Sequence, residues 1–208
     1  AHAALLTGAD GKLSKRLGAT DVDHWRESGI EPLALAAKLA RIGTSLPVEP
    51  VAALDPLAQS FDFATFGRAP ARFDEGELAR LNAQTIHLLE YDQAADRLPP
   101  GMDAEAWAAV RPNLERVADA ADWWQVIQGP VAADASPEDR DYLRAAADLA
   151  AAVAWSDDPW AALTAALKEG TGRKGKALFL PLRRALTGRD HGPHLAALLP
   201  LIAPDRPQ

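Results

Sequence analysis

Two lysines three positions apart lie near the start of the sequence, in the run Gly11-Lys12-Leu13-Ser14-Lys15-Arg16. Mobile ammonium groups on a glycine-led loop suit a polyphosphate, because they can follow and neutralise the charge that builds on a departing pyrophosphate. Short basic strings are also common as solvated surface loops. On the chemistry of this one segment, the solvated loop is the favoured interpretation.

A second basic segment, Gly170 to Lys176, formally fits the dinucleotide-binding glycine pattern and most of the P-loop pattern. Both patterns require a buried strand before the glycines, whereas Trp160 to Lys168 has the character of a helix, and Ala177 stands where the P-loop has its Ser or Thr metal ligand. We interpret the segment as a flexible basic loop leading into a helix that carries Arg183 and Arg184, a surface able to hold a phosphate backbone. A helix connector with solvated charges fits the same residues equally well.

The remaining reactive side chains predict no self-contained active site. The sequence has no Cys, which excludes disulfides, thiolate zinc sites and cysteine nucleophiles. His191 and His194 form an H-x-x-H pair, but no third ligand is close in sequence and Gly192-Pro193 would break a helix between them, so we expect a surface loop and no metal. No Ser-His-Asp pattern or helix-borne His-Glu pair is present.

Charge is distributed unevenly along the chain. The net charge of −7 argues weakly against a nucleic-acid partner, but residues 161–208 hold 8 Lys/Arg against 3 Asp/Glu, while residues 71–160 hold 7 against 18. The C-terminal part can therefore face phosphate while the acidic middle keeps the protein soluble. No secretory signal and no apolar run of membrane-spanning length is seen, so we expect a cytoplasmic protein without membrane contact.

Helices must position these groups, because the chain is rich in Ala, Leu, Arg and Glu and poor in β-branched and aromatic runs. The sequence predicts an all-α protein without strands of comparable strength. Capping residues, among them Asp74, Ser136 and Asp158, combine with apolar spacing to indicate where helices start. The predicted helices run over about 32–42, 75–98, 104–111, 114–127, 137–155, 159–168 and 177–187. Breaks rich in proline and glycine separate these helices, and the change from neutral to acidic composition near residue 70 indicates a boundary between a small first unit and a larger helical one.

Taken in order, four blocks of this chain resemble the bacterial glutamyl-tRNA synthetase family over essentially its whole length. The first, Leu5-Leu6 through the Lys12 to Arg16 run to Gly18, is similar to the family's "KMSKS" loop. The others are Gly29-Ile30-Glu31-Pro32 with Arg41-Ile42-Gly43, then Phe73-Asp74 with Leu81-Asn82, and finally Gly175 to Arg183 with Ala185-Leu186-Thr187-Gly188 and His191-Gly192-Pro193. Four blocks in the family's order are a far more specific signal than one short basic loop.

The resemblance implies a class I ligase that activates glutamate with ATP and Mg²⁺ and transfers it to tRNA. It implies that residues 1–70 hold the signature loop and a helical stem-contact segment, and that 71–135 and 136–208 are two helical bundles of an anticodon-binding domain. It assigns Lys15 to the ATP phosphates, supported by Lys12 and Ser14. Six further residues become candidates for tRNA contact: Arg111, Asn113, Arg173, Lys174, Lys176 and Arg183.

Two departures from the family pattern limit what we expect. The family's "HIGH" motif and nucleotide-binding sheet are absent from the 208 residues, so we expect this chain alone to bind tRNA as a monomer, without bound cofactor, and not to aminoacylate. Asn113 follows Arg111-Pro112 where some relatives carry an Arg associated with the last anticodon base, which leaves open whether a glutamine tRNA is also accepted. The alternative is a free-standing, non-catalytic relative that acts as an RNA-binding or protein-interaction module.

Overall fold

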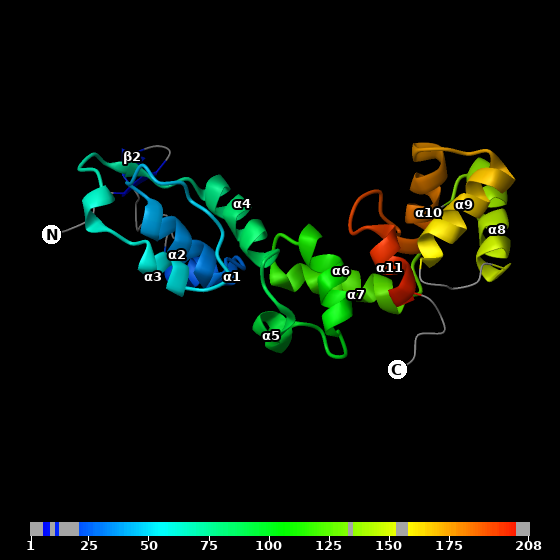
Figure 1. Ribbon diagram of the computed structural model, residues 1–208, viewed down its shortest axis with the longest axis horizontal. Coiled ribbons are helices and arrows are strands. Elements are labelled where there is room, and N and C mark those ends of the chain that lie inside the picture. Colours follow the sequence, from blue (N-terminus) through cyan, green and yellow to red (C-terminus); the bar gives the residue numbers. More distant parts are fainter. Residues whose placement is uncertain (1–5, 9–10, 13–20, 133–134, 153–157, 203–208) are drawn as a thin grey trace. The chain divides into compact units, whose positions relative to one another are not determined.

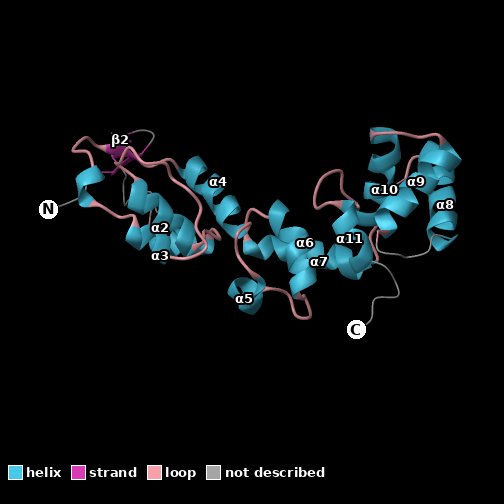
Figure 2. Ribbon diagram, in the orientation of Figure 1, coloured by secondary structure: helices cyan, strands magenta, loops and turns pink. Residues whose placement is uncertain are grey.

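The computed structural model describes residues 6–8, 11–12, 21–132, 135–152 and 158–202, and it is mostly helical (Figures 1 and 2). The all-α prediction is confirmed, with one small addition. Contacts divide the chain into two compact units. The first holds Ala1–Leu98 and Arg111–Ala120, and the second holds Pro99–Val110 and Ala121–Gln208.

The first unit begins with a small sheet that the sequence did not predict. Strand β1 (Leu6–Gly8) pairs antiparallel with β2 (Gly11–Lys12) and parallel with β3 (Ala71–Arg72), in the order β2-β1-β3. Each strand has only two or three residues, too few for a period-two pattern to be recognised in the sequence.

Helices α1 (Val22–Glu27), α2 (Pro32–Arg41), α3 (Asp55–Gln59) and α4 (Glu75–Ile86) build the core of the first unit. The core residues are Trp25, Ala34, Ala37, Leu57, Phe73, Leu78 and Leu81. Asp74 caps α4 by accepting a hydrogen bond from the backbone N–H of Glu77, as its sequence predicts. Lys38 on α2 is buried and forms an ion pair with Glu77, which links α2 to α4.

Asn82 connects three separate segments of the first unit. Its side chain is 1% exposed, accepts a hydrogen bond from the backbone N–H of Glu31 at 2.7 Å, and donates to the carbonyl oxygens of Gly29 at 3.2 Å and Glu115 at 2.8 Å. Two blocks of the family resemblance, around Gly29 and around Asn82, are therefore joined directly. Arg97 adds an ion pair to Glu31 at 2.5 Å.

The predicted helix over 75–98 was wrong in its length. Helix α4 ends at Ile86, and Glu90 begins α5 (Tyr91–Ala94) with a capping box in which the Gln93 side chain accepts from the backbone N–H of Glu90. A short 3₁₀ turn, Ala95–Arg97, follows. The predicted helix over 114–127 also begins late, because Asp119 caps a 3₁₀ turn at Val117–Asp119 before α7.

The second unit contains α6 (Ala104–Val110), α7 (Ala120–Gln128), α8 (Pro137–Ala152), α9 (Pro159–Thr171), α10 (Lys176–Thr187) and α11 (Leu195–Ile202). Its core joins α8, α9, α10 and α11 through Tyr142, Ala146, Leu163, Leu167, Leu178, Leu182, Leu195 and Leu199. The predicted caps Asp158 and Ser136 each accept a backbone N–H at the start of α9 and α8. Helix α11 was missed because Pro200 lies inside it. The backbone oxygen that Pro200 leaves without a helical donor belongs to Ala196, an exposed residue.

Candidate nucleic-acid interface

Two of the predicted tRNA-binding residues lie where α9 passes into α10: Lys174 is in the α9–α10 loop and Lys176 is the first residue of α10, and both are exposed. Helix α9 ends at Thr171 and is capped by Gly172, which has a left-handed backbone (φ +68°), and α10 starts after Gly175, which also has a positive φ (+54°). The positive φ at each glycine lets the backbone turn between the two helices, so that Lys174 within the turn and Lys176 directly after it are both exposed.

Arg173 lies on the same loop but its guanidinium points to α8. It forms an ion pair with Asp139 at 2.6 Å and lies 4.3 Å from the centre of the Tyr142 ring. Hydrogen bonds from Arg173 and Ser136 lower the pKa of the Asp139 carboxyl below its ordinary value. Burial raises the pKa of the Tyr142 phenol to about 12, and its hydroxyl donates to the Leu178 carbonyl.

Arg183 is half-buried on α10 and donates to the carbonyl oxygen of Pro193 at 3.0 Å, while burial lowers the pKa of its guanidinium. This contact fastens the loop 188–194 to the helix. The same loop is held by an ion pair from Arg184 to Asp190, with two hydrogen bonds of 2.6 and 2.9 Å. Sequence reasoning expected an ordinary surface loop here and missed how firmly it is fixed.

Trp123 is the other attachment point of the loop 188–194. The Arg189 guanidinium lies 4.6 Å from the Trp123 ring centre, and Gly192 packs so closely on the indole that a Cβ at that position would overlap it. The glycine in the His191-Gly192-Pro193 block is therefore required by packing. Within the residues that the structure describes, no group of three or more His, Cys, Asp or Glu is arranged to hold a metal.

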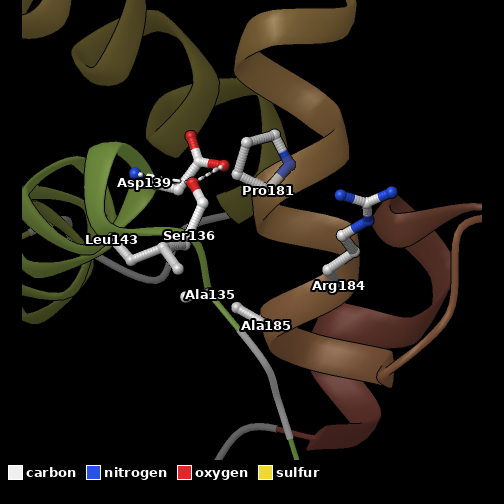
Figure 3. A pocket seen from close by; sticks show the side chains of 7 residues that line it. All are labelled: Ala135, Ser136, Asp139, Leu143, Pro181, Arg184 and Ala185. Carbon is white, nitrogen blue, oxygen red and sulfur yellow. Dashed lines mark hydrogen bonds between the residues drawn. The ribbon is translucent and has the colours of Figure 1, made fainter.

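A shallow hollow lies between the start of α8 and α10 (Figure 3). It is lined by Ala135, Ser136, Asp139, Leu143, Pro181, Arg184 and Ala185. In the close-up, Ser136 and Asp139 are joined by hydrogen bonds on one wall, and the Arg184 side chain lies on the α10 side. The polar groups that line the hollow are engaged with one another or with Asp190, so we assign no ligand to it.

Arg111 and Asn113 belong to the first unit, in a 3₁₀ turn at Arg111–Asn113. Arg111 donates to the Leu89 carbonyl at 2.5 Å and lies 3.3 Å from the Glu90 carboxylate, which closes the break between α4 and α5. Asn113 is exposed. Of the six predicted tRNA-contact residues, the three arginines thus fasten backbone segments, while Asn113, Lys174 and Lys176 face solvent.

The predicted ATP-loop residues are only partly described. Lys12 lies in β2, where its backbone pairs with Thr7 of β1. Ser14 and Lys15 lie outside the described residues. Among the helices that are described, none combines the length and apolar character that crossing a lipid bilayer requires.

Known proteins match this chain in sequence and in fold. It is 64% identical to a protein named glutamate–tRNA ligase 1 from Rhizorhabdus wittichii over 206 residues, covering 99% of this chain and 46% of that protein. It is 53% identical to glutamate–tRNA ligase 1 from Zymomonas mobilis over 207 residues, again 99% of this chain and 47% of that protein. The chain thus spans about half the length of the curated relatives it matches.

The crystal structure of a glutamate tRNA ligase from Elizabethkingia meningosepticum has the same fold, with a TM-score of 0.74 at 21% identity, over 98% of this chain and 48% of that one. The family model for the anticodon binding domain matches residues 78–207. The resemblance to bacterial glutamyl-tRNA synthetases is confirmed by these similarities, and the chain belongs to the anticodon-binding domain family.

Proposed function

We propose that this chain is the tRNA-binding part of a glutamate–tRNA ligase, and that it contacts both the stem and the anticodon loop of tRNA. One observation carries the proposal: similarity to a named ligase covers 99% of the chain at 64% identity. The exposed lysines of the α9–α10 loop support it, because a tRNA-binding surface needs cations that are free to reach phosphate.

In this proposal residues 1–70 are the signature loop and stem-contact segment, and 71–135 and 136–208 are the two parts of the anticodon-binding domain. In the longer ligase, ATP and Mg²⁺ serve adenylate formation, with Lys15 at the ATP phosphates and Lys12 and Ser14 beside it. The lysine ammonium groups would neutralise the phosphate charge. The protein is a cytoplasmic monomer that accepts a glutamate tRNA.

A filter-binding titration of the purified chain against unmodified glutamate tRNA, repeated across salt concentrations, tests the proposal. Affinity should fall steeply as salt rises, with a slope set by the number of phosphates contacted. A helical protein-interaction module would show no binding even at low salt. Glutamate-dependent pyrophosphate exchange by this chain should be undetectable. Measurable exchange would contradict the proposal that the chain binds tRNA but does not activate glutamate by itself.

The choice between glutamate and glutamine tRNAs is tested with Asn113→Arg. Arg reads a base edge through two parallel donors, whereas Asn offers one donor group and one acceptor. We expect this substitution to change the ratio of affinities for the two tRNAs by roughly tenfold, since one good bidentate contact is worth about 1–3 kcal/mol. An unchanged ratio would place Asn113 away from the anticodon.

A further inference from the structure

The Arg173 guanidinium contacts four groups within the second unit. It donates to the Asp139 carboxylate at 2.6 Å, to the Glu138 carbonyl at 3.1 Å and to the Ala177 carbonyl at 3.3 Å, and it covers the ring of Tyr142 at 4.3 Å. Its side chain is 26% exposed. These contacts join the loop between α9 and α10 to the first turn of α8.

A proline explains why one of these acceptors is available. In a regular helix the Ala177 carbonyl would accept from the backbone N–H four residues later, but that residue is Pro181, which has none. Arg173 supplies the missing donor. The position of the guanidinium is thus set by α10 as well as by α8, and the fork of fixed donors suits several acceptors at once.

The loop has few other attachments. Gly172 and Gly175 have open space where a Cβ would be, and both have a positive φ, which glycine adopts without steric cost. Between them, one side chain from the described part of the chain bonds to the backbone: the Thr171 hydroxyl accepts from the Arg173 N–H at 3.3 Å. Among the described residues, Arg173 is what fixes the loop on which Lys174 and Lys176 are presented.

We propose that Arg173 is a positioning residue for RNA binding: it does not contact tRNA, and it clamps the α9–α10 loop to α8 so that Lys174 and Lys176 face the phosphate backbone. The inference rests on the proposed function, since it assigns roles within that tRNA-binding surface. It differs from the prediction made from sequence, in which Arg173 was itself a contact residue.

A double-mutant cycle on the full 208-residue chain separates positioning from contact. Lys174→Gln with Lys176→Gln should lower the salt slope of tRNA binding by about one per lysine. Arg173→Met should weaken binding by about three- to tenfold in the otherwise unchanged chain, and by less than about 1.5-fold when both lysines are already Gln, because coupled residues are not additive. Equal losses in both backgrounds would show that Arg173 contacts phosphate itself and overturn the proposal.

Arg173→Lys sharpens the same test. It keeps the positive charge but loses the planar fork and the stacking on Tyr142. A positioning residue is not rescued by this change, so affinity should match that of Arg173→Met. Full rescue by lysine would indicate a direct phosphate contact.

Asp139, the partner of Arg173 in the clamp, gives a prediction in which the change in affinity is opposite to what charge alone would produce. Asp139→Asn removes a negative charge near a proposed RNA surface, which by charge alone should strengthen binding, yet it also releases Arg173 and should weaken binding at least threefold. Asp141→Asn is the matched control, because Asp141 is exposed on the same helix and pairs with Arg144 at 3.4 Å and not with Arg173. Binding that strengthens equally in both variants would refute the clamp.

Circular dichroism melts confirm that each variant is folded at the assay temperature, so a loss of binding is not a loss of structure. The proposed function and the clamp fail in different ways. If the unchanged chain does not bind tRNA at low salt, the proposed function is wrong, and the clamp as stated falls with it. If the chain binds but the two lysine substitutions leave affinity and salt slope unchanged, only the clamp is overturned.

Discussion

Replacing Asn82 with Ala should destabilise the first unit more than any substitution of an exposed polar residue. The change removes three hydrogen bonds, from Glu31 and to Gly29 and Glu115, with lengths between 2.7 and 3.2 Å. A hydrogen bond contributes about 1 kcal/mol net, and a buried group left without a partner costs about 1–3 kcal/mol. With three backbone groups affected, we expect a loss of about 3–5 kcal/mol in the free energy of unfolding.

Urea unfolding followed by far-ultraviolet circular dichroism and by tryptophan fluorescence measures this loss. Asn113→Ala is the matched control: the same side chain is deleted at an exposed site, where a change within about 0.5 kcal/mol is expected. Asn82→Asp keeps the acceptor for the Glu31 N–H but places a carboxylate against two carbonyl oxygens. It should be at least as destabilising as Ala at neutral pH and less so in acid, where the carboxyl regains one donor.

A loss below about 1 kcal/mol for Asn82→Ala would refute the reasoning, because it would mean that water or a backbone shift satisfies all three groups. Equal losses at positions 82 and 113 would have the same meaning. The Glu31 to Arg97 ion pair does not complicate the comparison, since neither substitution removes it.

Three further predictions concern the second unit. Gly192→Ala should cost about 2 kcal/mol or more from overlap with Trp123, whereas Gly172→Ala, which has open space, should cost only the roughly 1 kcal/mol of a left-handed alanine; thermal melts of both variants measure the difference. Burial raises the pKa of the Tyr142 phenol to about 12, so its proton is held more tightly in the folded state. The stability that the protonated phenol contributes should be complete below pH 10 and lost as pH rises towards 12. Alkaline unfolding curves of Tyr142→Phe should lack this loss. The hydrogen bonds from Arg173 and Ser136 lower the pKa of the Asp139 carboxyl, so its contribution to stability should be complete above the ordinary value of 3.8 and disappear as pH falls through the lowered pKa. The stability difference between the unchanged chain and Asp139→Asn should therefore shrink in acid. A difference that stays constant with pH would count against the ion pair.

Much of the fold could be predicted because capping residues and apolar spacing act locally. Asp74, Ser136 and Asp158 each cap the helix that their sequence context indicated. The errors arose where a distant contact decides the outcome. Helix α4 stops because a new capping box at Glu90 competes with continuation, and α11 forms across Pro200 because its leucines are needed in the core of the second unit.

The candidate site was harder to predict, because the sequence shows which residues are basic but not which are already occupied. Arg173 and Lys174 are neighbours with the same formal charge, yet one is bound to Asp139, 34 positions away, and the other is exposed. The helix dipole alone would account for the acidic first turn of α8, so the sequence gives no sign that Arg173 pairs with it. Long-range ion pairs of this kind leave no periodic signal.

The burial of Lys38 has a practical consequence for mapping the proposed RNA-binding surface. The sequence has lysines only at positions 12, 15, 38, 168, 174 and 176, and Lys38 is 3% exposed and paired with Glu77, whereas Lys168, Lys174 and Lys176 are exposed. An amine-reactive reagent should therefore leave Lys38 unlabelled as long as the first unit stays folded. Lys38 thus serves as an internal control for folding in a chemical footprinting experiment. While it stays unlabelled, a loss of labelling at an exposed lysine can be attributed to a bound polyanion.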